Sequence, residues 1–313
     1  MESWLDQFIA SVCQLFPAHS MLALNFNVRA MLALIFISVI CGAVGSLVVG
    51  NRLAFFSDAL AHCAFAGVAL GILFALLFRV ARDNVFEWVV PIMIVFGILT
   101  GLGIIFVGEK TSQSSDTVIG VFFAGAIGLG AILLKVGNAV IRFPTDDFLF
   151  GNLVLVTSGE LLALFALVVA TLGLLAWIYN GLVFANFNTS LARSRRIPLR
   201  LYNYLFIVLL AMIVNICLSS VGALLINALL VVPAATAANL CRNMRQLFRW
   251  SIIICLTMSL VGQWVSWEVA IPTGGGGVPV HPGESGTIVV LNVLVFFASM
   301  LVGPWLRNRP VTA

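Results

Sequence analysis

Apolar residues run along this chain in blocks of about 20 residues, separated by short polar segments. A helix rises 1.5 Å per residue, so a block of this length can cross the hydrocarbon core of a bilayer, which is roughly 30 Å thick. The pattern predicts such helices at 29–50, 54–78, 87–108, 115–141, 154–180, 202–218, 221–240, 250–270 and 287–306. The break at Ser219–Ser220 is very short, so the two blocks beside it could instead be a span plus a re-entrant or broken helix. We therefore expect an all-α polytopic membrane protein, a bundle of eight or nine transmembrane helices.

Little of the chain lies outside these blocks. Residues 1–28 precede the first block, and within them Glu2–Phe16 has the pattern of a short amphipathic segment at the membrane interface. Residues 307–313 follow the last block as a short cytoplasmic tail. The sequence therefore predicts one transmembrane domain, residues 29–306.

Composition supports this interpretation. Hydrophobic residues make up 62% of the chain, charged residues only 9%, and the mean hydropathy is +1.14. Soluble domains carry about 25% charged residues, so a soluble protein is excluded. The six cysteines lie mostly within apolar blocks and form no CxxC pair, which makes them packing residues rather than disulfide or zinc ligands. The net charge of +4 comes from arginines in short loops and gives no reason to expect nucleic acid.

The arginines also orient the helices. They cluster in the loops at 193–200 and 242–249 and in the segment 307–309. Alternation of the spans puts all three clusters on one side of the membrane, which the positive-inside rule makes cytoplasmic. The acidic pair Asp146–Asp147 and the loop 271–286 then face outward.

One predicted span contains two ionisable residues, Asp58 and His62. Their spacing of four places both side chains on one face of a helix, about 6 Å apart along the axis. Ionisable side chains in hydrocarbon cost roughly 2.5–3.5 kcal/mol each on insertion scales, so they are rare there and are usually functional. A carboxylate oxygen and an imidazole nitrogen can together bind a divalent transition metal. From the residues alone, a structural ion pair and a substrate pathway remain equally open.

Other motifs point away from enzyme chemistry. Gly103–Thr111, GIIFVGEKT, imitates a phosphate-binding loop, but Glu109 interrupts the required Gly-Lys order and a membrane helix precedes the segment. The zinc-protease signature HExxH is absent, and the two other histidines are His19 and His281, the latter interpreted as a loop residue. A serine protease would need a nucleophile, and Ser158 in TSGE is more simply a helix cap.

Two further features have two interpretations each, and a third has one. The segment Asn186–Arg200, NFNTSLARSRRIPLR, is either a solvated anchoring loop or a docking helix whose arginines meet a cytosolic partner. Asn227, within a later span, either bridges helices through a hydrogen bond or lines a path. Small residues at helix-packing spacing, Gly120, Ala124 and Gly128 among them, are typical of tightly packed bundles.

Three segments, in this order, resemble the membrane permease subunits of ABC-type importers for zinc, manganese and iron, the ABC-3 permease family. They are Arg52–Gly67 (RLAFFSDALAHCAFAG), Ser190–Ile197 (SLARSRRI) and Val221–Ala237 (VGALLINALLVVPAATA). The resemblance covers about residues 28–305. Two positions depart from the family pattern, because Ala61 stands where Ser usually precedes the His and Arg196 stands where Gly is usual.

The resemblance implies a transport subunit and not an enzyme, located in the bacterial inner membrane as a homodimer or a pair with a central path. It implies that Asp58 and His62 of each subunit bind the transported zinc, manganese or iron transiently, with zinc expected first and no permanently bound cofactor. A cytosolic ABC ATPase subunit and an extracytoplasmic metal-binding protein are the implied partners. The implied ATPase-docking residues are Ser190, Leu191, Ala192, Arg193, Arg195 and Arg196.

Two other classes of function remain as alternatives. A secondary metal ion transporter would work without an ATPase. A membrane-embedded hydrolase would need a catalytic constellation, and the pair Asp58 and His62 lacks both a third ligand and a nucleophile in the sequence.

Overall fold

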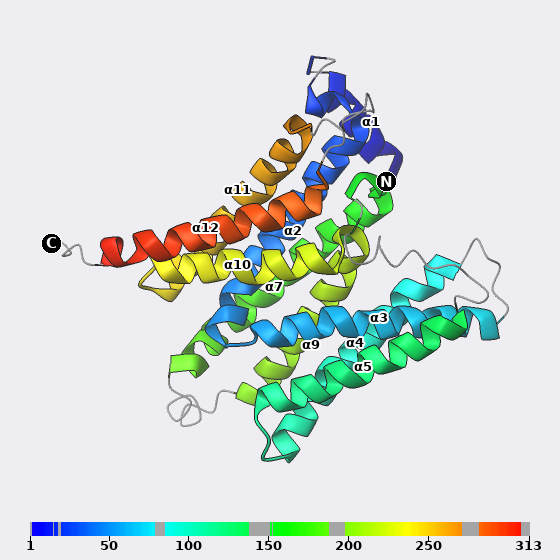
Figure 1. Ribbon diagram of the computed structural model, residues 1–313, viewed down its shortest axis with the longest axis vertical. Helices are drawn as coiled ribbons and strands as arrows, with labels where there is room; N and C mark the ends of the chain where they lie inside the picture. The colour runs from blue at the N-terminus through cyan, green and yellow to red at the C-terminus, as the bar shows by residue number, and fades with distance from the viewer. Residues whose placement is uncertain are drawn as a thin grey trace, which may run out of the picture. The chain divides into compact units, whose positions relative to one another are not determined.

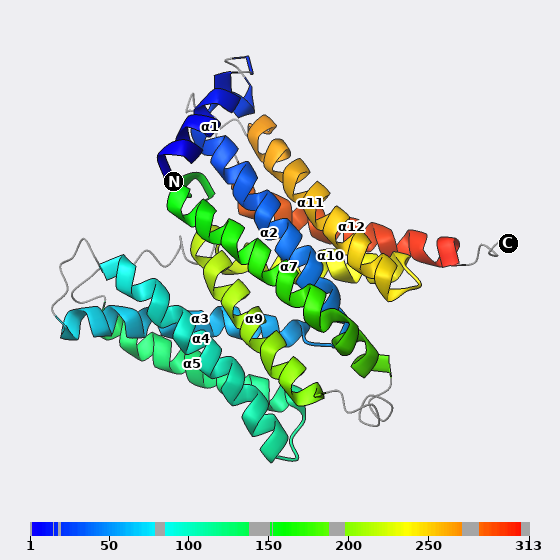
Figure 2. The same cartoon turned by 180° about the vertical axis from the view of Figure 1, so that it is seen from behind.

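A computed structural model of the protein describes residues 2–14, 16–17, 20–78, 85–137, 151, 153–187, 198–270 and 282–307. These residues form mainly α-helices (Figure 1, Figure 2). The helices are α1 (Glu2–Gln14), α2 (Asn25–Gly50), α3 (Ala54–Leu77), α4 (Val85–Lys110), α5 (Ser115–Gly137), α7 (Ser158–Phe187), α9 (Leu199–Val221), α10 (Ala223–Leu240), α11 (Met244–Glu268) and α12 (Glu284–Arg307). Two single turns of 3-10 helix, η1 (Met21–Ala23) and η3 (Leu153–Leu155), precede α2 and α7.

Within the described residues, nine helices, α2 to α12, are long and apolar enough to cross a membrane. The predicted all-α membrane bundle is therefore confirmed, with the higher of the two predicted helix numbers. The short helix α1 covers most of the predicted amphipathic segment, while its position at the membrane interface stays a prediction. The last residues of the predicted tail, 308–313, lie outside the described part of the chain.

The short break between the sixth and seventh spans lies at Gly222 and not at the serine pair. Ser219 and Ser220 belong to α9, and Ser219 Oγ donates a 2.7 Å hydrogen bond back to the carbonyl of Ile216. Gly222 has φ 82°, a left-handed conformation that costs glycine little and other residues more. The helix therefore ends where glycine permits the turn, and α9 and α10 each keep the length of a span.

The chain forms two compact units. The first consists of residues 1–49, 150–173 and 220–313, and the second of residues 50–149 and 174–219. In the first unit α10 and α12 run side by side and both contact α11 (Figure 1, Figure 2). In the second unit α3 packs against both α4 and α5.

Glycines allow the helices of the first unit to touch backbone to backbone. A Cβ atom at Gly45 in α2 would overlap the carbonyl oxygen of Leu230 in α10, and one at Gly42 would lie 2.5 Å from Cα of Ile252 in α11. Polar bonds join the same helices where they are buried, for example between the hydroxyls of Ser38 and Ser259 at 2.8 Å. Close packing and a few interhelical hydrogen bonds replace the hydrophobic driving force that lipid does not provide.

The second unit packs in the same way around α3. A Cβ atom at Gly67 would lie 2.9 Å from Cα of Met93 in α4, and Gly71 makes an equivalent contact with Val89. On the other side, a Cβ at Gly130 of α5 would lie 3.2 Å from Cα of Ala66. These contacts fix α3 between its two neighbours, and hence fix which of its faces is left open.

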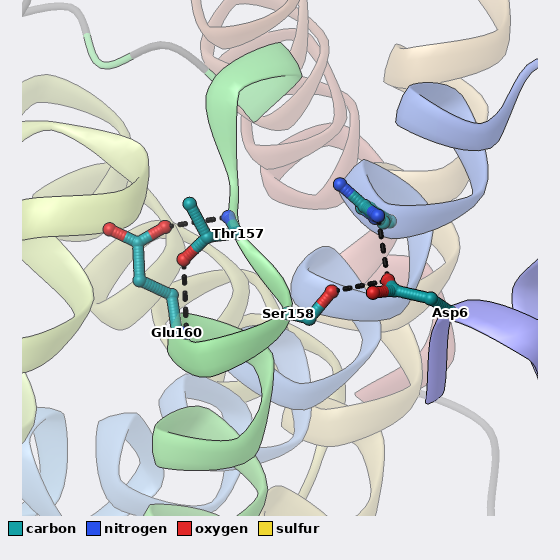
Figure 3. A network of polar contacts seen from close by, with 5 residues as sticks. Asp6, Thr157, Ser158 and Glu160 are labelled. Carbon is teal, nitrogen blue, oxygen red and sulfur yellow. Dashed lines mark hydrogen bonds and ion pairs between the residues drawn. The ribbon is translucent and has the colours of Figure 1, made fainter. Parts of the chain in front are cut away.

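A small polar network attaches α1 to the first unit (Figure 3). The Asp6 carboxylate accepts a 2.6 Å hydrogen bond from the Ser158 hydroxyl at the start of α7, and a 2.7 Å bond from Arg29 Nη2 of α2. The hydrogen bond from Ser158, and then the charge of Arg29, lower the pKa of Asp6 against the opposing effect of partial desolvation. Asp6 therefore stays ionised and joins α1, α2 and α7.

The residue that caps α7 is Thr157, one position before the serine that the sequence suggested. Thr157 Oγ1 accepts from the Glu160 backbone N–H at 3.3 Å, and the Thr157 N–H donates to Glu160 Oε2 at 2.9 Å (Figure 3). This reciprocal pair is a capping box, which satisfies two backbone donors at a helix start. Ser158 is thereby free to bind Asp6.

We predict that Gly45→Ala destabilises the protein, because the new methyl group would overlap the Leu230 carbonyl and force α2 away from α10. Overpacking of this kind costs about 1–3 kcal/mol, which should lower the midpoint of thermal unfolding in detergent. Gly173→Ala in α7 is the matched control, since nothing lies within 4 Å of a Cβ atom there. Equal midpoints for the two variants would contradict the packing.

Candidate functional site

Asp58 and His62 lie on the open face of α3. Most of α3 is buried, including the neighbouring residues Leu60, Ala61 and Cys63. The side chains of Asp58 and His62 nevertheless remain 41% and 37% exposed. The two side chains share one face, as their spacing predicts, and the structure directs that face away from the packed interior of the second unit.

The two side chains are close enough to share one ion. His62 Nε2 lies 3.6 Å from Asp58 Oδ1, which is longer than a good hydrogen bond. Zinc binds histidine nitrogen and carboxylate oxygen at about 2.0–2.2 Å, so two ligand atoms of a tetrahedral site lie about 3.4 Å apart. The observed separation thus needs almost no adjustment for a divalent ion to bind both atoms.

An aromatic contact holds the imidazole in place. The ring of His62 meets the ring of Phe123 in α5 edge to face, with centroids 5.4 Å apart and an angle of 87° between the planes. Phe55 of α3 also lies against Phe123, at 6.5 Å between centroids. Such contacts restrict rotation of the imidazole without using either of its nitrogens. Phe123 carries no signal in the sequence, because it is one apolar residue within an apolar helix.

The described residues supply no third ligand. No group of three or more His, Cys, Asp or Glu side chains lies within metal-binding distance in this part of the chain. Cys63 is buried, with its sulfur 4.0 Å from the Phe122 carbonyl oxygen. Ala61 is fully buried, so it faces the interior and not the open face on which the pair lies. An ion on the pair would need further ligands from water or from a second protein chain.

The remaining sequence predictions are not tested by the structure. The proposed docking residues 190–196 lie outside the described part of the chain, as do His19, His281 and residues 271–281 of the loop 271–286. Asn227 lies on α10 in the first unit, whereas the pair lies on α3 in the second. Its role as a path-lining residue stays a prediction.

Comparison with known proteins adds independent findings. The family model described as the ABC 3 transport family matches residues 23–303. The manganese import system permease protein ScaB of Streptococcus parasanguinis is 27% identical over 287 residues, covering 91% of this chain and 93% of that protein. The high-affinity zinc uptake system membrane protein ZnuB of Haemophilus influenzae is 27% identical over 233 residues, covering 74% and 84%.

A solved structure is similar over almost its whole length. A chain of PsaBC from Streptococcus pneumoniae, in complex with Fab, superposes with a TM-score of 0.72 at 25% sequence identity, covering 96% of this chain and 98% of that chain. An inward-facing conformation of a putative metal-chelate type ABC transporter superposes with a TM-score of 0.67 at 14% identity. The second likeness shows the fold alone.

We predict that Asp58→Asn and His62→Gln leave stability almost unchanged. Both side chains are more than one-third exposed, and an ion pair at this helical spacing contributes only about 0.2–0.5 kcal/mol. Thermal unfolding of each variant in detergent should match the parent chain, with Gly45→Ala as a destabilised reference. If the midpoint of thermal unfolding fell as far as it does in Gly45→Ala, the pair would have a structural role.

Proposed function

This chain belongs to the ABC 3 transport family, and from that membership we propose that it is the permease subunit of an ATP-driven importer of divalent transition metal ions. It is an integral membrane protein and not itself an enzyme, since ATP hydrolysis takes place in a separate chain. We place it in the bacterial inner membrane, with a cytosolic ABC ATPase and an extracytoplasmic metal-binding protein as partners. The relatives named for manganese import and zinc uptake support the class of substrate.

The structural observation that supports a divalent metal as the substrate is the pair Asp58 and His62. One oxygen and one nitrogen ligand, 3.6 Å apart on the open face of a membrane helix, suit zinc, manganese or ferrous iron. The separation lies near that of a tetrahedral site, which keeps zinc as the first candidate and manganese as the second. Few ligands also suit transport, because an ion must leave the site as readily as it enters.

A second copy of the chain would complete the site. The helix α5 contacts the open face of α3 through Phe123, and the two residues that follow Phe123 in α5, Ala124 and Gly125, are small and exposed. A Cβ atom at Gly120, Gly125 or Gly128 would meet nothing within 4 Å, so Gly120 and Gly128 do not make the packing contacts within the subunit that their spacing suggested. Exposed small residues allow close approach of another helix. In the homodimer that we propose, each copy contributes its aspartate and histidine.

The ATPase would supply the energy through the segment 190–196. In this proposal its arginines meet the ATPase, and ATP binding moves the segment so that the metal site opens to alternate sides of the membrane. The sequence alone leaves a secondary metal ion transporter as the alternative, and membership of the ABC 3 transport family speaks against it. It would need no ATPase, and uptake would persist in cells depleted of ATP.

We predict that Asp58→Ala and His62→Ala each reduce import of zinc and manganese at least about tenfold, because each removes half of the ligands that one subunit provides. Uptake is measured separately for zinc, manganese and iron in cells that lack other importers, at matched membrane levels of each variant. Asp116→Ala is the control, since it removes an exposed carboxylate from the start of α5 in the same unit. Import equal to that of the parent chain would refute the site.

We predict that charge reversal at Arg193, Arg195 and Arg196 abolishes co-purification of the ATPase, because like charges would then meet across the docking surface. The control reverses a different arginine cluster, Arg242, Arg245 and Arg249, which changes the net charge equally. ATPase recovered equally with both triple variants would show that the segment 190–196 is not the docking site.

A further inference from the structure

A cavity of about 610 Å³ lies at one end of the first unit. Four segments far apart in the sequence line it: the start of α2, the turn η3, the end of α11 and the start of α12. Its polar side chains come from Asn27 of α2, Ser266 of α11, and Glu284 and Ser285 of α12. Three of these are strongly buried, with exposed fractions of 1% for Asn27, 3% for Ser266 and 7% for Ser285.

The arginine distribution identifies which end of the unit this is. The helix α11 begins beside Arg242, Arg245 and Arg249 and reaches the cavity with Ser266, near its other end. A helix of 25 residues is about 37 Å long, enough to cross the bilayer. Since the arginine-rich end is cytoplasmic by the positive-inside rule, the cavity lies at the extracytoplasmic end.

Glu284 brings an unsatisfied carboxylate oxygen to this cavity. Its Oε2 atom is buried without a hydrogen-bond partner, and among the described residues no ion pair involves Glu284. As the first residue of α12 it lies at the positive end of the helix dipole, which favours a negative charge at this position. The dipole does not replace the missing partner, because a buried carboxylate oxygen without one carries a desolvation cost.

A second unsatisfied oxygen lies beside the cavity wall. Gln263 is 1% exposed, and its amide nitrogen is 3.5 Å from the backbone carbonyl of Asn27, to which it donates. Its Oε1 atom is buried and has no hydrogen-bond partner in the described part of the chain. Arg29, the nearest cation along α2, is engaged with Asp6 through a 2.7 Å ion pair. The cavity is therefore lined by a carboxylate oxygen of Glu284 that has no hydrogen-bond partner among the residues described, and Gln263, which contacts Asn27 in the cavity wall, carries a second such oxygen.

We propose that this cavity is an entry site for a hydrated divalent cation, with Glu284 as its charged ligand and amide and hydroxyl oxygens around it. Six water molecules occupy about 180 Å³, so a fully hydrated ion fits within 610 Å³. Divalent ions that keep most of their water are commonly bound through only one or two carboxylates, which suits a weak site. The proposal rests on the importer function, since an imported ion would reach a site at the extracytoplasmic end before it crosses the membrane.

The test measures binding of Mn²⁺ to the purified permease–ATPase complex in lipid nanodiscs, by the loss of the free-ion EPR signal. The complex carries Asp58→Ala and His62→Ala, so that binding at that pair does not contribute. We expect a weak site to remain in this background, and Glu284→Gln to weaken it at least about tenfold. Glu268→Gln is the matched control, because Glu268 is an exposed carboxylate at the same end of α11 and does not line the cavity.

Glu284→Asp keeps the carboxylate and should retain most of the Mn²⁺ affinity that Glu284→Gln loses. This result would show that Glu284→Gln weakens binding by removing a ligand and not by misfolding the protein. In the otherwise unchanged importer, Glu284→Gln should raise the KM for metal uptake with little change in the maximal rate. Equal Mn²⁺ affinity for Glu284→Gln and Glu268→Gln would overturn the entry site and leave the importer function intact. Normal metal uptake by the Asp58→Ala and His62→Ala variants would instead refute the proposed intramembrane site and not the cavity.

Discussion

Close contact between helix backbones is the constraint on which the rest of this structure depends. In lipid, apolar side chains gain nothing by leaving one hydrocarbon surface for another, so helices associate through packing and a few hydrogen bonds. The chain meets this requirement with glycines, such as Gly45 on the Leu230 carbonyl and Gly67 on Met93. Because such contacts leave no room for a Cβ atom, they fix the rotation of each helix about its axis.

The fixed rotation of α3 determines where the side chains of Asp58 and His62 point. Gly67 and Gly71 hold α3 against α4, and Gly130 holds α5 against α3. The face that remains is the one carrying Asp58 and His62, whose ligand atoms are 3.6 Å apart. Without these contacts α3 could rotate about its axis, and the direction of the two side chains would not be fixed.

The features that the sequence predicts well depend on one helix at a time. The thickness of the bilayer sets the length of each span, and the helical period places Asp58 and His62 on one face. The position of the break between α9 and α10 was harder to predict. Ser219 is polar, but its hydroxyl donates a hydrogen bond back to its own helix, so the helix continues and the turn occurs at Gly222. The contact of Phe123 with His62 depends on the position of α5 and leaves no local pattern.

The two proposed sites differ in the chemistry of their ligands, and this difference assigns them different tasks. The cavity at Glu284 offers oxygens alone, which bind magnesium and calcium as readily as manganese. The imidazole of His62 instead favours transition metals over these abundant ions. In the proposed transport cycle, an ion held with its water shell at the outer cavity would exchange water for nitrogen when it binds His62. In this scheme the outer site concentrates divalent cations, and selection among them takes place at His62.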